Sequence, residues 1–581
     1  MQNQAGNQSK GAGAEAVMKQ EGAHGGSVGD KPKTAEVKAA PQENVFEYAE
    51  SKGSKFVKYS FYTVFVGAFV WIGFNLFFQQ PASFFLGLTK LFAGPVAEMA
   101  KMNELRVMLP YEEVSFEPTK TDPLVGTRLE NTYDPLVRPD RDFRMKPALA
   151  LSWGVIGETM WEFNLRPNVI FHDGSAFSAT DVVASLNRAK NHDDSELKDV
   201  LKNIEKVEIV DDLAVRVFTK VPDPMLLSEL ASVLIIPSEY EKKIIETPVG
   251  TGPYMFEKIY PQDRIVYKRF DKYWGDKPKF ETVVLYGRSD ISERGNMLLN
   301  GKVDLLTFVP FSAIETFKER NFKIVSVPTL SMEFLLFNVN SKVLQNAENR
   351  NAIRLAVDTG VLANSLKGSA KAINQYASNG VFGFNPNILT PKYDMKVSKE
   401  TVSKLGLKDM TLTMSLPDGL QYIGDYVKKD LGAVGINLLI SYFDDFEKFM
   451  ESVDSGAADL YFFGYQSNFG DANDFMKDMA HSKAQFNYGK YSNLNADQLI
   501  ASASTEMDPQ KRRMFLQDAM KVLVEEDPIG VPLLEYEAFY SFSDKIDYAP
   551  RIDESLYFDD VNIKGKYPFE TNGFSRFHCS L

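Results

Sequence analysis

The chain has 581 residues, of which 65 are Lys or Arg and 78 are Asp or Glu, giving a formal net charge of −13 at pH 7. It is too long for one compact domain, because single hydrophobic cores stop growing beyond about 250–300 residues. The acidic balance argues against a nucleic-acid-binding protein, which needs a basic surface to displace counterions from phosphates. The only cysteine, Cys579, excludes an intramolecular disulfide and a cysteine-based zinc site.

Residues 1–55 are predicted to be a disordered cytoplasmic tail. Up to residue 43 they consist mainly of Gly, Ala, Gln, Lys, Glu and Ser, with very few bulky apolar side chains. Such a segment cannot bury enough apolar surface to offset the entropy that it would lose on ordering.

A transmembrane anchor is predicted over residues 56–80. The stretch 59–78 has no charged residue, and at ~1.5 Å rise per residue a helix of this length spans the roughly 30 Å hydrocarbon core of a bilayer. The alternative, a buried helix of a soluble core, rarely stays uncharged for so long. The lysines that flank the stretch are Lys52, Lys55 and Lys58 before it, and Lys90 and Lys101 after it.

These flanks predict the orientation of the anchor. More positive charge precedes the span than follows it, so the positive-inside rule leaves the tail in the cytoplasm. Residues 81–101 then form a membrane-proximal linker. We therefore expect a single-pass protein of the cytoplasmic membrane whose C-terminal part is periplasmic or extracellular.

Local signals indicate alternating strands and helices after the linker. Residues 158–167 alternate apolar and polar side chains, as in a half-buried strand. Asp173-Gly174 between two apolar runs predicts a hairpin with a type I′ turn. Ser178 is expected to cap a helix over residues 179–190, with Asp181 favourable in its first turn.

The sequence contains no recognisable catalytic or metal-binding motif. There is no GxSxG nucleophile elbow, no HExxH, no Walker loop and no GxGxxG after a strand, and the five histidines are scattered. His172 is interpreted as a residue that satisfies the backbone of the predicted turn. We therefore expect no enzyme activity, no bound metal and no cofactor.

Several segments carry a family resemblance, and they follow one another in the family's order. They are PALALSW at 147–153, WEFNLRPNVIFHDGSAFSATDVVASLNR at 161–188, TGPY at 251–254, FDKYWGDKP at 270–278, GKVDLL at 301–306, FNVNS at 337–341 and NRNAIRLAVD at 349–358. Together they resemble the signature of the family 5 extracellular solute-binding proteins, the oligopeptide, dipeptide and nickel class of ABC importers. The resemblance covers roughly residues 107–581.

The resemblance implies an α/β fold of the periplasmic-binding-protein type (type II), with two lobes and three domains that close on a ligand by a hinge. The chain would cross between the lobes near Leu335–Val339 and Tyr536–Tyr540. The implied domains are domain I at 102–134, 248–335 and 540–581, domain II at 135–247, and domain III at 336–539.

In the peptide-binding members, a strand of domain III and an Asp in the motif W-x-x-D-Y-x-D-P hold the ligand. The matching residues here begin at Gly464. Tyr465 replaces the Trp as an aromatic wall, and Gln466 and Asn468 would orient the ligand. Asn468 stands in place of the Asp that takes the ligand's amino group, which removes a charge-assisted partner worth roughly 1.5–3 kcal/mol. Asp471 could replace it, but we favour Asp471 as the cap of a helix that begins at ANDFMKDMA.

On the facing lobe, residues 115–137 resemble the family's first strand and loop. The resemblance implies that Leu124 and Val125 lend their backbone to a peptide ligand. Tyr133 begins Tyr-Asp-Pro-Leu where the family usually has Tyr-Glu-Gly-Leu, so the turn there is altered.

These features together predict a membrane-anchored solute-binding receptor of an ABC importer. It would bind a short peptide or a similar polar solute between its lobes and deliver it to the permease. Two alternatives stay open: an oligosaccharide receptor of the same family, which would suit Asn468 and the tyrosines, and a ligand sensor that does not deliver.

Overall fold

The computed structural model describes residues 103–110, 115–121, 127, 129–388, 393–467 and 469–564. All of them fall in one compact unit, Lys55–Leu581. Within these ranges no helix is both long and apolar enough to cross a bilayer. The predicted tail, transmembrane anchor and linker lie outside the described residues and stay predictions.

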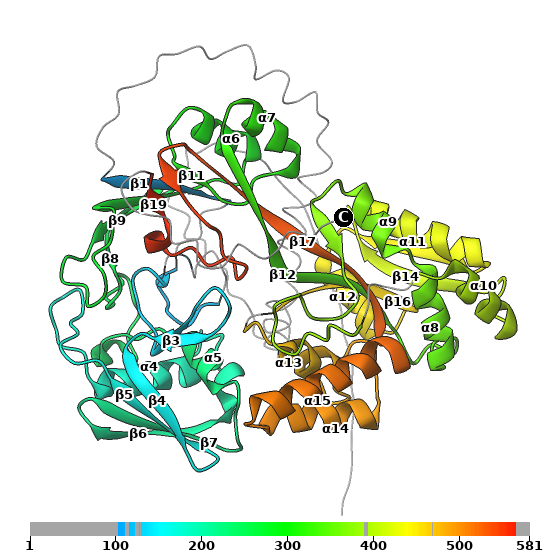
Figure 1. Ribbon diagram of the computed structural model, residues 1–581, viewed down its shortest axis with the longest axis horizontal. Helices are drawn as coiled ribbons and strands as arrows, with labels where there is room; N and C mark the ends of the chain where they lie inside the picture. The colour runs from blue at the N-terminus through cyan, green and yellow to red at the C-terminus, as the bar shows by residue number, and fades with distance from the viewer. Residues whose placement is uncertain are drawn as a thin grey trace, which may run out of the picture. The chain divides into compact units, whose positions relative to one another are not determined.

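A mixed sheet of 11 strands is the largest element of the described ranges (Figure 1). Its strands lie in the order β15-β14-β16-β12-β17-β11-β1-β10-β9-β8, and β13 pairs with β17 beside this path. The strands are β1 (Glu104–Leu109), β8 (Tyr254–Tyr260), β9 (Arg264–Arg269), β10 (Thr282–Gly287), β11 (Leu305–Leu306), β12 (Lys323–Phe337), β13 (Ala370–Ala372), β14 (Thr411–Pro417), β15 (Asn437–Phe443), β16 (Leu460–Gln466) and β17 (Gly530–Phe542). Helices α6 (Ile291–Leu299) and α7 (Ile314–Glu319) lie beside the β1 end.

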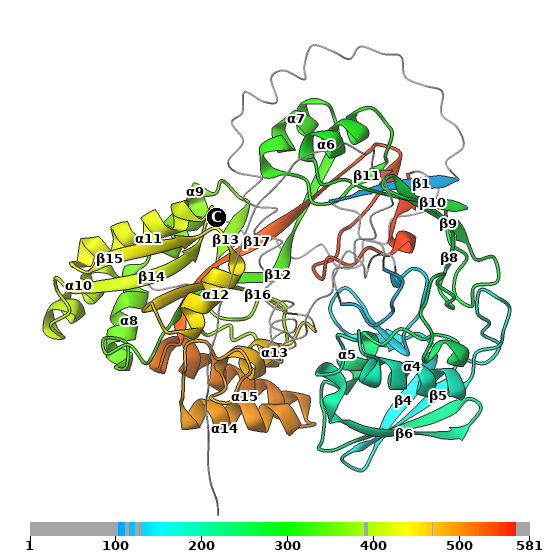
Figure 2. The same cartoon turned by 180° about the vertical axis from the view of Figure 1, so that it is seen from behind.

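Strands β12 and β17 carry the chain from one end of this sheet to the other, as Figure 2 shows from behind. They pair antiparallel along most of their length, but the ladder is interrupted between Pro328 and Met332. There, three residues of β12 face Tyr536 alone, and Thr329 Oγ1 donates a hydrogen bond to the Tyr536 carbonyl at 3.1 Å. The interruption in β12 thus lies several residues before the predicted crossing at Leu335–Val339.

A second sheet, in the order β4-β5-β7-β6, forms a separate body with its own core. Its elements are β4 (Ala150–Ile156), β5 (Met160–Leu165), β6 (Ile204–Asp211), β7 (Ala214–Thr219), α4 (Ala179–Asn191) and α5 (Leu226–Ala231). The predicted strand and helix are both confirmed here, as β5 and α4. Ser178 caps α4 in a capping box with Asp181, as the sequence indicated.

The predicted turn at Asp173-Gly174 is present, but its type differs from the prediction. Phe171 donates its N–H to the Ser175 carbonyl, and only Gly174 has positive φ, at 91°. A type I′ turn needs positive φ at both central residues, so the prediction of that type was wrong. Asp173 keeps negative φ, and its carboxylate accepts the Ser175 N–H at 2.9 Å.

Contrary to the prediction, His172 does not satisfy the backbone of the predicted turn; its ring binds a distant segment instead. Its Nδ1 accepts the N–H of Gly250 at 3.3 Å, and its Nε2 lies 2.9 Å from the carbonyl of Gly252. Burial lowers the pKa of His172 to about 4. The ring is therefore neutral at pH 7, and it holds the turn against residues 250–252.

Helices cover both faces of the large sheet at its β16 end. One face packs against α8 (Ala347–Ala356), α9 (Thr359–Ser365), α10 (Met395–Lys404) and α11 (Gln421–Val434). The other packs against α12 (Phe446–Asp454), α13 (Ala472–Phe475), α14 (Leu494–Thr505) and α15 (Pro509–Lys521). We call this part the β16 lobe, the β4–β7 body the small-sheet lobe, and the core around β1 and β8–β11 the β1 lobe.

Candidate ligand-binding cleft

One edge of strand β16 is open toward its C-terminal end. The strand pairs with β12 along its whole length, from Leu460 to Gln466. On its other side, β14 pairs only with Leu460 and Tyr461. From Phe462 to Gln466 no strand within the described ranges covers this edge. Open edges present unpaired backbone groups that can accept a strand from another chain.

The side chain of Tyr465 faces the core and not this edge. Its ring is 1% exposed and lies perpendicular to Phe475 at 5.4 Å. Side chains alternate along a strand, so Tyr461, Phe463 and Tyr465 all point to the α12–α15 face. The predicted aromatic wall is thus a core residue in this structure, and its hydroxyl donates to Asp478 at 3.1 Å.

Gln466 points to the opposite face, where its side chain is 7% exposed. Its Oε1 has no hydrogen-bond partner among the described residues, and neither has Oγ of Ser331, its register partner on β12. A buried acceptor without a donor is costly, so this amide is available to a ligand N–H. Gly464, two residues earlier, is half-buried, and Asn468 lies outside the described residues.

Asp471 caps a helix, as the sequence analysis favoured. Its Oδ1 accepts the N–H of Asn473 at 2.9 Å at the start of α13. Arg512 on α15 holds both of its oxygens, with Nη1 to Oδ2 at 2.6 Å and Nη2 to Oδ1 at 3.0 Å. A ligand contact for Asp471 stays a prediction.

Of the three contacts predicted on the facing lobe, the structure describes only Tyr133. Leu124 and Val125 lie outside the described residues. Tyr133 is fully buried, and its hydroxyl donates to the carbonyl of Phe116 at 3.4 Å. Its ring packs in a small core with Leu129, Leu234, Ile236 and Ile245. A direct ligand role for these three residues also stays a prediction.

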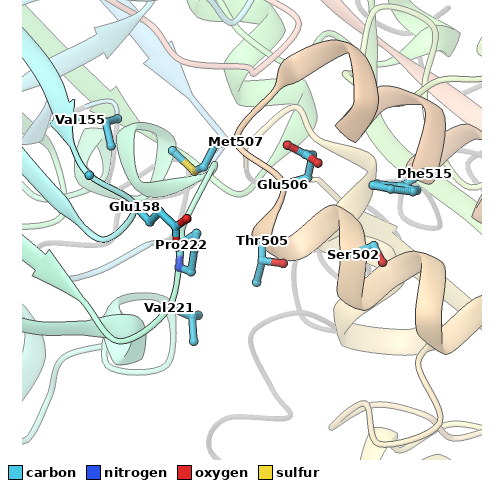
Figure 3. A pocket seen from close by; sticks show the side chains of 10 residues that line it. Val155, Glu158, Val221, Pro222, Ser502, Thr505, Glu506, Met507 and Phe515 are labelled. Carbon is cyan, nitrogen blue, oxygen red and sulfur yellow. The ribbon is translucent and has the colours of Figure 1, made fainter.

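Two cavities lie between the small-sheet lobe and the β16 lobe. The first has a volume of about 770 Å³, and Figure 3 shows its two walls, with Met507 between them. It is lined by Val155, Gly157, Glu158, Val221, Pro222, Ser502, Thr505, Glu506, Met507 and Phe515. The second has a volume of about 680 Å³ and begins at Phe469 and Gly470, just beyond the open edge.

The second cavity, which we call the aromatic cavity, is lined from both lobes. Pockets of about 300–1,000 Å³ with aromatic walls and a few polar groups are typical of small-ligand sites. The small-sheet lobe contributes Asp142, Phe143, Arg144, Trp161 and Pro224. The β16 lobe contributes Gly380–Phe384, Pro386, Phe469, Gly470, Met507, Pro509, Arg512, Arg513 and Gln517.

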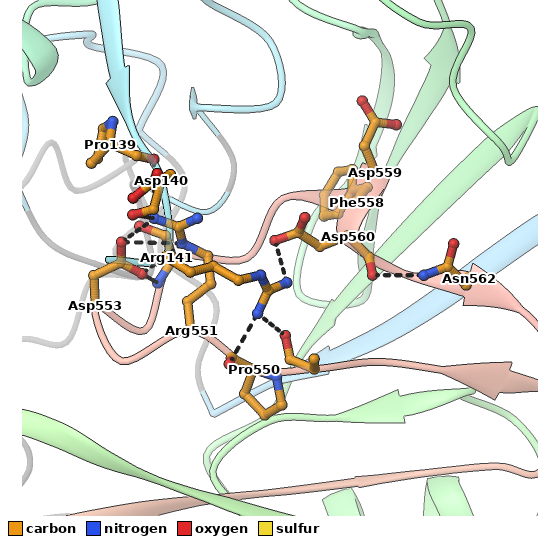
Figure 4. Close-up of polar contacts among 12 residues, drawn as sticks. Pro139, Asp140, Arg141, Pro550, Arg551, Asp553, Phe558, Asp559, Asp560 and Asn562 are labelled. Carbon is orange, nitrogen blue, oxygen red and sulfur yellow. Dashed lines mark hydrogen bonds and ion pairs between the residues drawn. The ribbon is translucent and has the colours of Figure 1, made fainter. Parts of the chain in front are cut away.

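Phe143 stands at the tip of a short hairpin, β2 (Val137–Pro139) and β3 (Met145–Pro147). Two arginines fasten this hairpin to the C-terminal segment (Figure 4). Arg551 donates to the carbonyls of Pro139 and Asp140, both at 3.2 Å, and Arg141 pairs with Asp560 at 2.9 Å. The tip reaches the other lobe so closely that a Cβ on Gly470 would lie 2.6 Å from the Phe143 ring.

Acidic side chains meet near the contact between the lobes. Glu229 on α5 is 5% exposed, and its Oε2 has no hydrogen-bond partner in the described ranges. Burial, with smaller contributions from nearby Asp223 and Asp474, raises the pKa of Glu229 to about 8 against the opposing effect of Lys477. On the β16 lobe, burial raises the pKa of Asp474 to about 8 as well. Both carboxyls are therefore largely protonated at neutral pH.

The two lobes touch at this acidic region. Asn473 Nδ2 of the β16 lobe lies 3.6 Å from Met225 Sδ of the small-sheet lobe. Beneath the same segment, Asp474 accepts the Ser467 hydroxyl at 3.0 Å and the Phe469 N–H at 3.1 Å. Asp474 therefore fixes the chain on both sides of Asn468.

Sequence reasoning missed the residues of the aromatic cavity. The run Gly380-Val381-Phe382-Gly383-Phe384 and the adjacent Arg512 and Arg513 were available as signals. They become a site only because α15 and this loop face the small-sheet lobe. Among the described residues, no group of three or more His, Cys, Asp or Glu side chains could hold a metal ion.

Comparison with known proteins identifies the family. A family model described as bacterial extracellular solute-binding proteins, family 5 Middle, matches residues 144–487. The glutathione-binding protein GsiB of Salmonella paratyphi A is 27% identical over 473 residues, which cover 76% of this chain and 91% of that protein.

Solved structures show the same fold. HbpA2 from Haemophilus parasuis aligns with a TM-score of 0.74 at 19% identity, covering 79% of this chain and 100% of that one. The periplasmic binding protein DppA from Helicobacter pylori, in complex with the peptide STSA, aligns with a TM-score of 0.63 at 21% identity, covering 79% and 98%. The expected α/β periplasmic-binding-protein fold is thereby confirmed. With its family model matched over more than half of its length, the chain belongs to the bacterial extracellular solute-binding proteins of family 5.

Proposed function

We propose that this protein is the extracytoplasmic receptor of an ABC importer and that it binds a short peptide between its lobes. The observation that carries the proposal is the open edge of β16 from Phe462 to Gln466, beside a cavity between the lobes. An extended peptide can add to such an edge, so that its main chain makes the hydrogen bonds and pockets take its side chains.

The names of similar proteins support a peptide ligand. The similar protein from Salmonella paratyphi A is called glutathione-binding, and glutathione is a tripeptide. The Helicobacter pylori protein was solved with the peptide STSA. The unpartnered Oε1 of Gln466 fits the same ligand class, because a peptide offers N–H donors at regular intervals.

Closure would occur about the β12–β17 pair. The three-domain partition is supported by the β1-lobe core, which combines residues from 105–109, 254–285 and 538–561. The irregular ladder at Pro328–Met332 is a place where backbone dihedrals can change without breaking a regular set of hydrogen bonds. Hinges commonly consist of a few such strand residues.

The proposal includes the membrane anchor at residues 56–80 and delivery to a permease in the same membrane. Its support is the uncharged stretch 59–78 and the lysines that precede it. An anchored receptor stays near the permease, so it would not have to diffuse away and return between uptake cycles.

The test uses the full chain purified in mild detergent. Mass spectrometry of the co-purified solute should find a short peptide. Hydrogen exchange with that solute should then slow the amides of Phe462–Gln466. Strand β15, the outer edge of the same sheet, serves as the control and should not change.

Other outcomes point to the alternatives. If an oligosaccharide co-purified and slowed hydrogen exchange at the same amides, the ligand would be a sugar and not a peptide. Slower exchange on β15 and not on β16 would contradict the open-edge site. If a tail deletion abolished a cellular response but left uptake intact, the protein would be a sensor.

A further inference from the structure

The small-sheet lobe and the β16 lobe meet at a contact that is closed to solvent. Met225, the residue that precedes α5, is 4% exposed, and Asn473 of α13 is fully buried. The Asn473 amide nitrogen lies 3.6 Å from Met225 Sδ, and it also donates to the Ser504 hydroxyl of its own lobe at 3.2 Å. Because the two side chains in contact belong to different lobes, separation of the lobes would expose them to water.

A carboxyl group without a hydrogen-bond donor lies beside this contact. Glu229 follows Met225 by one helical turn, since its N–H donates to the Met225 carbonyl at 3.0 Å. Glu229 is 5% exposed, and no described residue donates a hydrogen bond to its Oε2. An ionised carboxylate is costly in such a place, because it has lost its water and gained no donor in return. Contact between the lobes therefore favours the neutral carboxyl.

Charged residues of both lobes act on Glu229. Burial is the largest cause that raises its pKa, from 4.5 to about 8. Asp223 of the small-sheet lobe and Asp474 of the β16 lobe raise the pKa as well, while Lys477 and Lys202 lower it. The two acids are buried and both lysines are exposed, so solvent screens the lysines more strongly. Separation of the lobes would hydrate Glu229 and move Asp474 away from it, and both changes favour the ionised form.

We propose that closure of the lobes is coupled to uptake of a proton by Glu229, so that the closed form gives way to the open form as the pH rises. This rests on the closure proposed above for the β12–β17 pair, and not on the identity of the ligand. The proton joins the carboxylate from solvent when the lobes close, and it returns to solvent when they open. A ligand held between the lobes is accordingly bound more tightly at pH 5.5 than at pH 8.5.

The direction of this effect follows from the pKa of Glu229 in each form. The closed form, in which the pKa is raised, is favoured in full below the ordinary value of 4.5, and this advantage is lost as the pH rises to about 8. Between these limits the ratio of closed to open protein should fall by at most about tenfold per pH unit, because one proton is exchanged.

The experiment measures the distance between the lobes in the full chain, purified in mild detergent and freed of co-purified solute by dialysis. Nitroxide labels at Ser152→Cys on β4 and Gln510→Cys on α15, both exposed positions, report this distance by double electron–electron resonance. The background is Cys579→Ser, so that no other residue is labelled. The shorter distance should predominate at pH 5.5, and a longer one should gain population at pH 8.5.

Three variants identify the group that titrates. Glu229→Gln should keep the shorter distance at both pH values, because its amide carries no charge. Glu205→Gln removes the same charge from an exposed position on β6, and it should respond to pH as the parent protein does. Gly470→Ala should lengthen the distance at both pH values, since a methyl group there would meet the Phe143 ring. It therefore tests whether the labels detect opening.

Two outcomes would overturn the inference alone. One is a distance in the parent protein that stays the same or shortens as the pH rises, although Gly470→Ala lengthens it. The other is a pH response that persists in Glu229→Gln. If neither pH nor any variant changes the distance, the lobes do not move, and the proposed closure fails together with the inference. The peptide ligand is decided separately, by the co-purified solute and by hydrogen exchange at β16.

Discussion

Arg512 donates to Asp471 from two nitrogens, at 2.6 and 3.0 Å, and both residues are more than 90% buried. The pair joins α15 to the start of α13, which begins a few residues after β16 ends. Paired in this way, Asp471 needs no cation from a ligand. The ion pair thus has a structural role between these two helices.

Removing Arg512 should destabilise the fold strongly. Arg512→Met leaves a buried carboxylate without its partner, which costs about 3–5 kcal/mol. Urea unfolding monitored by circular dichroism would measure this loss. Lys511→Met, on the exposed side of the same helix, should change the free energy of unfolding by less than about 0.5 kcal/mol. The double variant Arg512→Met/Asp471→Asn should recover part of the stability, and no recovery would mean that Arg512 acts through packing alone.

Gly470→Ala should push the lobes apart. The new methyl group would lie 2.6 Å from the Phe143 ring, and Gly470 has φ of 64°. Gly406→Ala is the matched control, because Gly406 has φ of 68° and a methyl group there would have no other atom within 4 Å. Both variants bear a backbone cost of about 1–2 kcal/mol. Only Gly470→Ala should increase acrylamide quenching of Trp161, and equal quenching in both variants would contradict an interlobe clash.

Stability should fall as the pH rises from about 5 to 8. The pKa of Glu229 is about 8 in the folded protein against 4.5 when it is free. Its contribution is fully present below the unfolded pKa and is lost as the pH rises through the folded pKa, with a slope of at most about 1.4 kcal/mol per pH unit. The groups that act on it are Asp223, Asp474, Lys477 and Lys202.

Glu229→Gln should flatten this dependence. Urea unfolding at pH 5, 6.5 and 8 would measure the free energy of unfolding of both proteins. That of the variant should increase relative to that of the parent protein as the pH rises. A residual slope is expected from Asp474, whose pKa is raised in the same way. Parallel curves for parent and variant would rule out Glu229 as the group that titrates.

Tyr536→Phe should weaken the centre of the β12–β17 pair. The Tyr536 hydroxyl donates to Glu333 Oε2 at 2.6 Å, and this carboxyl is buried with its pKa raised to about 8. Loss of the donor should raise that pKa further and cost about 1–3 kcal/mol. Tyr422→Phe removes the contact between the two tyrosine hydroxyls, at 3.2 Å, but leaves the bond from Tyr536 to Glu333 in place, and it should cost less. If both variants lost the same free energy of unfolding, the bond to Glu333 would contribute little to stability.

Local features could be predicted from the sequence where the determining contacts are themselves local. The Ser178 capping box and the Asp471 cap each depend on residues within three positions. The turn at Gly174 was placed correctly, but its type depends on the conformation of Asp173, which the Asp-Gly pair alone does not determine. The orientation of Tyr465 could have been deduced, because it shares strand parity with Tyr461 and Phe463.

Long-range features could not be predicted in the same way. Nothing in the sequence around Arg513 indicates that α15 faces Trp161, which lies more than 300 positions earlier. The acidic contact near Glu229 likewise depends on the packing of α5 against α13. Both features depend on how the small-sheet lobe packs against the β16 lobe. The hydrophobic pattern within one lobe does not indicate which surface of the other lobe it will contact.

The position of β17 between β12 and β11 sets the order in which this protein can assemble. The chain leaves β12 at residue 337 and returns to the gap beside it only at residue 530. Until then, both halves of the large sheet keep a bare edge, and Asn131 lacks the Leu556 carbonyl and the Phe558 N–H that it binds at 2.8 Å. A nascent chain therefore cannot finish its first lobe before its last segment has emerged. Completion of the β1 lobe is therefore a late folding step, because it joins segments that lie 425 positions apart in the chain.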